Sequence, residues 1–201
     1  MTIRKGEPWG TTCTLPDGVP VAHSDAEAWR LVVDGVRSFG VAGGDLARTM
    51  GGGSPGRMQG TVVCVPVDVV HVQLDGDRTL SVAHVVARTP GRLGWLRGPA
   101  LLALNAQFIG PYDVAPRGHP NDGRVDVVQV DAAMSPRTRL AARTRARTGT
   151  HVPHPFLTTR QVADQQFVFD RAVEVWVDGQ RWRRGSTLHL RVEPDALTVY
   201  A

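Results

Sequence analysis

Residues 61–76 read TVVCVPVDVVHVQLDG, and their pattern is the strongest indication of the fold class. Apolar residues alternate with other residues along it, and the run ends at Asp75-Gly76, a pair typical of hairpin turns. Residues 79–88, TLSVAHVVAR, repeat the pattern. The chain contains 29 Val, together with 22 Gly and 14 Pro, which favour turns between strands. Such β-branched composition predicts a mainly β protein.

Further strands are expected downstream of this region. Residues 125–133, VDVVQVDAA, form one, because they follow a glycine-containing turn. The run ALLALNAQFIG at residues 100–110 fits a helix or a buried strand, and periodicity does not decide between them. The tail predicts four short β segments, which are residues 156–164, 165–170, 172–179 and 187–201.

Helix signals are few but clear. Residues 24–39 begin with Ser24 as N-cap and a Glu three residues later, and apolar residues follow at helical spacing. Residues 136–147 form a second helix, with Ser135 as N-cap, proline in the first turn and glycine as stop. A short helical turn is expected at residues 46–50. Strands with few helices and no βαβ alternation predict an α+β chain dominated by a sandwich or barrel.

Composition excludes several classes of protein. With 201 residues, 42% hydrophobic and 21% charged, the chain fits one large domain or two small ones. It contains no apolar run that could span a membrane and no signal peptide, so a cytoplasmic location is expected. Two cysteines form no disulfide framework, and seven histidines show no metal-ligand spacing, which excludes redox and zinc chemistry.

The catalytic motifs that can be searched for directly are missing. The only lysine is Lys5, so a Walker-A phosphate loop is excluded, and no G-x-S-x-G nucleophile elbow occurs. Two Asp-Gly pairs, at Asp122 and Asp178, predict hairpin turns. An Asp fixed at a strand end can also act as a metal ligand or as a general base, and both interpretations stay open here.

The predicted helix at residues 136–147 carries Arg139, Arg143 and Arg147 at intervals of four residues. These arginines would share one basic face. That face is either a solvated surface or a docking site for anionic lipid headgroups. Nucleic-acid binding is not expected, because no aromatic side chains lie among the arginines of the helix.

Several motifs resemble, in order, those of the diacylglycerol kinase family, the bacterial lipid kinases related to NAD kinases and sphingosine kinases. GGDLARTMG at residues 43–51 resembles GTGNDLARTLG, and NAQFIGPYDVAPRGHPNDGRVDVVQV at residues 105–130 resembles N-x-x-x-x-G followed by P-x-A-x-x-D-D-G-x-L-D-V. THVPHPFLTT at residues 150–159 resembles G-x-H-x-x-x-P, and VWVDGQ at residues 175–180 resembles V-x-x-D-G-E. The match runs from about residue 40 to the C-terminus.

The resemblance implies a fold and a domain division. Family members join an α/β nucleotide domain to a C-terminal β-sandwich, so residues 60–201 are expected to form a two-layer antiparallel β-sandwich with short helices. Residues 1–59 would be a remnant of the nucleotide domain with its connecting loop. The family's phosphate-binding G-G-D-G-T loop has no counterpart in residues 1–40.

The resemblance assigns Gly43, Gly44 and Asp45 to a remnant of the nucleotide and phosphate loop. The Thr and Asn of GTGND are replaced by Ala42 and Gly44, which removes a hydroxyl and an amide that would face the nucleotide. Together with the missing upstream loop, these departures make ATP binding unexpected. Phosphoryl transfer depends mostly on positioning and charge neutralisation, so a chain without that cradle is expected to be inactive alone.

The resemblance also assigns catalytic and metal roles. Asp178 would be the general base for a lipid hydroxyl, although the Glu of D-G-E is replaced by Gln180. Asp122, with the Arg124 carbonyl, would hold Mg²⁺. The alternative for Asp122 is an ordinary turn in which its carboxylate caps a backbone N–H.

The leading functional hypothesis is a stand-alone lipid-kinase-like domain without its own ATP site, which binds a lipid, a membrane surface or another protein. Its location would be cytoplasmic or peripheral to the membrane. One alternative is an active lipid kinase completed by a partner chain or by a second copy. Another is a dimerising scaffold without a ligand.

Overall fold

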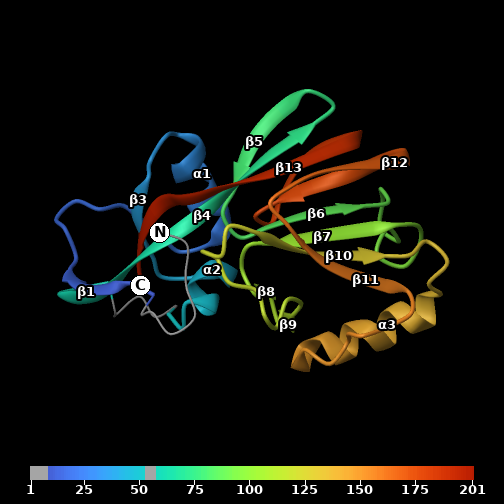
Figure 1. Ribbon diagram of the computed structural model, residues 1–201, viewed down its shortest axis with the longest axis horizontal. Helices are drawn as coiled ribbons and strands as arrows, with labels where there is room; N and C mark the ends of the chain where they lie inside the picture. The colour runs from blue at the N-terminus through green and yellow to red at the C-terminus, as the bar shows by residue number, and fades with distance from the viewer. Residues whose placement is uncertain (1–8, 53–57) are drawn as a thin grey trace.

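The computed structural model describes residues 9–52 and 58–201 (Figure 1). Most of the described chain lies in strands. The helices are α1 (Asp25–Val33), α2 (Gly44–Thr49) and α3 (Pro136–Arg145), the last extended by a 3-10 turn (Ala146–Thr148). The strands are β1 (Thr11–Thr14), β2 (Val21–Ala22), β3 (Ser38–Val41), β4 (Thr61–Leu74), β5 (Asp77–Ser81), β6 (His84–Arg88), β7 (Ala100–Leu104), β8 (Phe108–Ile109), β9 (Tyr112–Asp113), β10 (Val125–Val130), β11 (Leu157–Val162), β12 (Asp164–Val177) and β13 (Gln180–Tyr200).

The main sheet is almost entirely antiparallel. Its strands follow the order β1-β4-β13-β12-β6-β7-β10-β11, with β5 paired to β4. Parallel pairing occurs where β3 joins β13 and where β2 joins β3. The mainly antiparallel architecture predicted from the alternating valines is confirmed.

The sheet bends so that its two halves share one core, as Figure 1 shows for the strands above α3. Strands β4, β12 and β13 supply one side of this core, and β6, β7 and β10 supply the other. Alternate valines and leucines point inward, as expected for strands with one buried face. The buried side chains include Val72, Val85, Leu101, Val175 and Leu190. The predicted mainly β sandwich is therefore confirmed.

A second core joins the N-terminal elements to the long strands. Ala28 and Val32 of α1, Phe39 of β3 and Leu46 of α2 pack against the far ends of β4 and β13. The division into a remnant at residues 1–59 and a sandwich at residues 60–201 stays a prediction. Part of the glycine-rich stretch, residues 53–57, lies outside the described residues.

Several element boundaries differ from expectation. The helix predicted for residues 24–39 ends at Val33, because Gly35 turns into the left-handed region at φ +90° and residues 38–41 form β3. Residues 79–88 form two strands, and residues 100–104 form a strand. The four tail segments are three strands, because β12 runs through the expected break after residue 170 with a bulge, and β13 begins earlier than expected, at Gln180.

The predicted helix caps are confirmed. The Ser24 hydroxyl accepts the Glu27 N–H, and the Ser135 hydroxyl accepts the Thr138 N–H. The third helix is followed by Gly149 in the left-handed conformation. Over residues 9–52 and 58–201, no helix combines the length and the apolar character needed to cross a membrane.

Candidate functional site

The predicted phosphate-loop remnant forms the start of α2, and a carboxylate of the chain itself caps it. The Asp25 carboxylate accepts the N–H of Asp45 at 2.7 Å and the N–H of Leu46 at 3.0 Å. Gly43 and Gly44 allow this close packing. A Cβ at Gly43 would lie 2.4 Å from the His23 carbonyl oxygen, and one at Gly44 would lie 2.5 Å from Asp25 Oδ1. These two glycines bring a carboxylate, instead of a phosphate, to the helix start.

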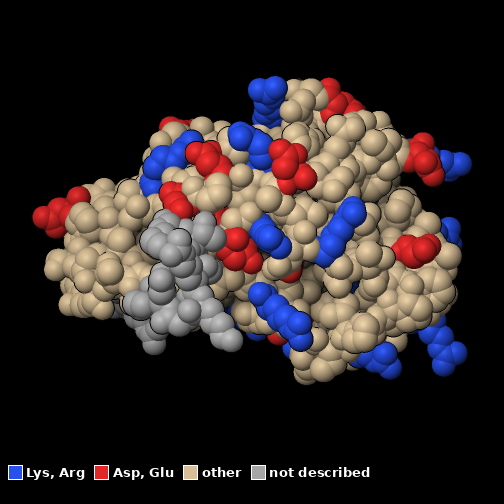
Figure 2. Space-filling view, in the orientation of Figure 1, with Lys and Arg blue, Asp and Glu red and all other residues tan. Residues whose placement is uncertain are grey.

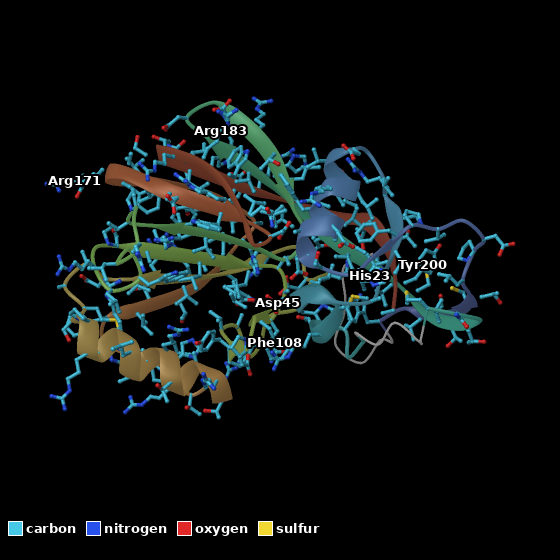
Figure 3. All side chains as sticks on the ribbon, turned by 180° about the vertical axis from the view of Figure 1, so that it is seen from behind. His23, Asp45, Phe108, Arg171, Arg183 and Tyr200 are labelled. Atoms are coloured by element: carbon cyan, nitrogen blue, oxygen red, sulfur yellow. The ribbon has the colours of Figure 1, made fainter. Side chains whose placement is uncertain are left out.

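His84 lies beside this helix start. Its Nε2 lies 3.2 Å from Asp45 Oδ2, and the Asp45 carboxylate also accepts the Gly110 N–H at 2.9 Å. Burial opposes a charge on His84, but the hydrogen bond to Asp45 and the charges of Asp178 and Asp25 outweigh it. Together they raise the pKa of His84 to about 9. The histidine is therefore a cation at neutral pH. Its partner Asp45 is labelled in Figure 3, near Phe108.

Asp178 lies beneath His84, inside the fold, with 1% of its surface exposed. Its Oδ1 accepts the Ser81 hydroxyl and the N–H groups of Ala83 and His84, and its Oδ2 accepts the Val82 N–H, all at 2.9 Å. Complete burial raises the pKa of this carboxyl, against the opposing effects of His84 and the backbone donors. The carboxylate thus holds together residues 81–84, where β5 gives way to β6. The general-base role stays a prediction.

Asp25, Asp45 and His84 each place one ligand atom within 4.8 Å of the others, so this group could hold a metal ion. The donor set does not match Mg²⁺, which prefers six oxygen ligands in octahedral geometry. Both carboxylates already accept backbone N–H groups, and a proton on His84 supplies the positive charge. The group therefore does not fit magnesium.

Asp122 caps its own turn. Its Oδ1 accepts the Arg124 N–H at 3.0 Å, and its Oδ2 accepts the Gln161 side-chain amide at 3.2 Å. This is the capped turn that the sequence left as the alternative to a metal site. Burial and the charge of Asp122 raise the pKa of the neighbouring Asp126 to about 6. Mg²⁺ binding at Asp122 and the Arg124 carbonyl stays a prediction.

A buried polar network under this turn was not predicted. Asp68 is fully buried and accepts the Asn121 side-chain amide at 3.1 Å, the Gly123 N–H at 2.7 Å and the Asp195 N–H at 2.9 Å. The Asn105 amide donates to the Asp68 carbonyl at 2.9 Å. These bonds fix the loop before β10 to β4. In the sequence, Asp68 is an acidic residue within a run of valines, and nothing around it indicates that it is buried and hydrogen-bonded.

The predicted basic face of α3 is wrong for Arg139, which is only 6% exposed. Its guanidinium points inward and donates to the backbone carbonyls of Met134, Asp131 and Gly98. Arg143 is exposed and lies with its guanidinium carbon 5.1 Å from the centre of the Tyr112 ring. Arg147 is exposed too, at 5.8 Å from the same ring. Two of the three arginines therefore remain on the surface.

An apolar cavity of about 320 Å³ lies between α3 and the sheet. Leu102 of β7 and Val128 and Val130 of β10 line it from the sheet, and Leu140 and Ala142 line it from α3. The lining also includes Arg139 and Arg143 of α3, Tyr112 of β9, and the loop residues Trp95 and His151. No sequence motif indicated this cavity, because its walls come from segments far apart in the chain.

Three solved structures from Bacillus anthracis str. Sterne are similar to the chain. One is described as a diacylglycerol kinase and two as candidate diacylglycerol kinases. They align with TM-scores of 0.64, 0.60 and 0.63 over 88% of this chain. The chain has the diacylglycerol kinase fold. The aligned part is 73% to 75% of those chains, at 10% to 12% sequence identity. No protein-family model and no curated protein matches the sequence.

Within the diacylglycerol kinase fold, the structure brings some predicted site residues together. Asp45 and Asp178 both bond to His84, the first to the ring and the second to the backbone N–H. Asp25 and His84 were not predicted from the sequence. Asp25 follows a helix N-cap and was indistinguishable from an ordinary first-turn acid, and His84 stood within a predicted strand. Asp122, Arg124 and the arginines of α3 do not belong to this group.

Proposed function

We propose that the chain is a lipid-binding module that takes up a single apolar chain between α3 and the sheet, without an ATP site of its own. The observation that carries the proposal is the apolar cavity of about 320 Å³. Ligand sites commonly have roughly 300–1,000 Å³, so this cavity lies at the lower end. At about 30 Å³ for each water-sized group, it accommodates on the order of ten such groups, or one medium-length chain.

The start of α2 supports the second half of the proposal. A helix N-terminus binds phosphate through its free backbone N–H groups and its positive dipole. Here the N–H groups of Asp45 and Leu46 already donate to the Asp25 carboxylate. A phosphate approaching this position would also meet the carboxylates of Asp45 and Asp25 at close range, and like charges repel it.

An anionic membrane is the proposed partner of the α3 side. Leu93, Trp95 and Leu140 are 53%, 46% and 51% exposed, and the last two also line the cavity. Residues 89–99 and 132–150 contain seven arginines and no acidic residue. In Figure 2, basic side chains project along the lower right edge, where Figure 1 places α3. Exposed apolar groups with arginines around them fit a headgroup region.

A steric variant tests the cavity. Ala142 lines it, whereas the neighbouring Ala141 is exposed and does not. In titration calorimetry with mono-octanoylglycerol, we expect Ala142→Phe to weaken binding by about tenfold or more, and Ala141→Phe to bind as the unchanged protein does. Equal affinities in both variants, or no binding by the unchanged protein, would overturn the proposed site.

Two further measurements test the other parts of the proposal. Sedimentation with vesicles should show binding when phosphatidylglycerol is present, and replacing Leu93 and Trp95 by serine should abolish it. Calorimetry with ATP and Mg²⁺ should show no binding by the chain alone. Tight ATP binding would refute the second half of the proposal and favour the active lipid kinase.

A further inference from the structure

The cavity between α3 and the sheet contains one buried polar side chain without a partner. His151 lines the cavity with 5% of its surface exposed, and neither ring nitrogen makes a hydrogen bond of acceptable geometry, although the Val114 carbonyl lies near. Buried polar groups in folded proteins are usually paired. An unpaired ring at the wall of an apolar cavity therefore points to a ligand that supplies the missing partner.

The other charged and phenolic side chains of the cavity wall are already engaged. Arg139 donates to backbone carbonyls, including that of Met134. Arg143 donates to the Tyr112 hydroxyl and packs over its ring. His151 is thus the one ionisable side chain in the described lining that remains available to a ligand.

The protonation state of His151 limits the chemistry of that ligand. Burial lowers the pKa of the ring, although Asp113 and the Val114 carbonyl oppose the shift, so the ring is neutral at physiological pH. A neutral imidazole offers one N–H donor and one acceptor nitrogen. A hydroxyl can pair with either nitrogen, whereas a carbonyl only accepts and an ammonium only donates. A carboxylate or phosphate would carry its charge into an apolar cavity, which is costly.

We propose that His151 anchors the hydroxyl group of an uncharged single-chain lipid whose apolar chain fills the cavity. The inference rests on the proposed function and adds the identity of the polar group that the site selects. In this arrangement the apolar walls formed by α3 and the sheet provide affinity for the apolar chain of the lipid. His151 provides selectivity for the hydroxyl over an apolar group of similar size, because a ligand that offers no hydrogen-bonding group leaves the buried ring unpaired.

The test compares two ligands of the same chain length, octan-1-ol and 1-chlorooctane, by titration calorimetry on the full chain. We expect the unchanged protein to prefer octan-1-ol. In His151→Phe, that preference should fall by about tenfold, chiefly through weaker binding of octan-1-ol. His151→Gln, which keeps a donor and an acceptor, should restore part of the preference. His154→Phe is the control, because His154 is absent from the cavity lining.

The outcomes separate the two proposals. If both ligands bind but His151→Phe leaves their affinity ratio unchanged, the proposed role of His151 is refuted, whereas the proposal that the cavity binds an apolar lipid chain stands. If neither ligand binds, the proposed function fails and the anchor fails with it. Equal binding of both ligands by the unchanged protein refutes the anchor without any variant. Mono-octanoylglycerol in a third arm distinguishes an acylglycerol, if it binds more tightly than octan-1-ol, from a simple long-chain alcohol.

Discussion

Replacing Asp178 by asparagine separates a structural carboxylate from a catalytic one. The residue has φ +48°, and asparagine tolerates this left-handed conformation better than most residues, so the substitution leaves the backbone unstrained. The side chain keeps its shape and loses its charge. One oxygen becomes an NH₂ group that faces the Val82 N–H, because the remaining oxygen serves Ser81, Ala83 and His84.

The magnitude follows from these contacts. A buried donor left without an acceptor costs about 1–3 kcal/mol, and each bond to a charged acceptor contributes about 1.5–3 kcal/mol. The protonated His84 also loses one of its compensating charges. Breaking a buried charge arrangement on one side costs about 3–5 kcal/mol, and we expect Asp178→Asn to fall in this range. For a chain of this size, each kcal/mol corresponds to roughly 2–4 °C in melting temperature.

Asp75→Asn provides a matched control. Asp75 also has φ +48° in an Asp-Gly turn, but its carboxylate is exposed and accepts only the N–H groups of Ser186 and Thr187. Urea unfolding followed by tryptophan fluorescence should show a loss below about 1 kcal/mol for this variant. If Asp178→Asn is no more destabilising than Asp75→Asn, the bonds around Asp178 do not hold the fold. The carboxylate would then be kept for chemistry, as the general-base role requires.

Three further variants test the interior of the molecule, and a fourth at an exposed arginine serves as a control. The folded pKa of His84 exceeds the unfolded value near 6.5, so its stabilisation of roughly 3 kcal/mol is complete below that pH and disappears as pH rises through about 9. Urea unfolding between about pH 6 and about pH 10 should show this slope, and His84→Gln should remove it. Asp25→Ala should cost about 1–2 kcal/mol in the same assay, because the start of α2 loses its cap. Arg139→Met should cost about 2–4 kcal/mol because four backbone carbonyls lose a charged donor, whereas Arg143→Met should stay within about 0.5 kcal/mol.

Local chemistry made much of the fold predictable. Alternating valines mark β4, and hydroxyl N-caps mark the starts of α1 and α3, because these signals act over a few residues. The end of α1 was missed, because apolar residues continue at helical spacing beyond Val33 and outweighed the local signal of Gly35. Pairing of β3 with the C-terminal strand fixes the boundary together with that glycine, and its partners Phe39 and Val199 are distant in the chain.

The candidate site was less predictable, because its bonds cross long sequence separations. Asp25 reaches the N–H of Asp45 twenty positions on, and Asp178 binds residues nearly a hundred positions upstream. No spacing rule reveals which N–H groups a carboxylate will cap. The α3 arginines show the same limit. Helical periodicity places Arg139 and Arg143 on one face, but Arg139 is buried while Leu140 is exposed, so packing of the helix overrides the polarity of its residues.

Charge divides the molecule into two ends that suit different ligands. Around the start of α2, the carboxylates of Asp25, Asp45 and Asp178 surround the cation His84, and Arg48 adds a second positive charge near Asp45. Three carboxylates against two cations leave this cluster anionic, so a phosphate bound there would add to its negative charge. Around α3, arginines surround an apolar cavity, with no acidic side chain in residues 89–99 or 132–150. In the proposed function, an uncharged apolar chain would lower its free energy by entering that cavity, and the arginines beside it would attract an anionic membrane surface that supplies the lipid. At the start of α2 the N–H groups of Asp45 and Leu46 are thus already bonded within the chain, and the cavity beside α3 has the features on which we base the proposed lipid site.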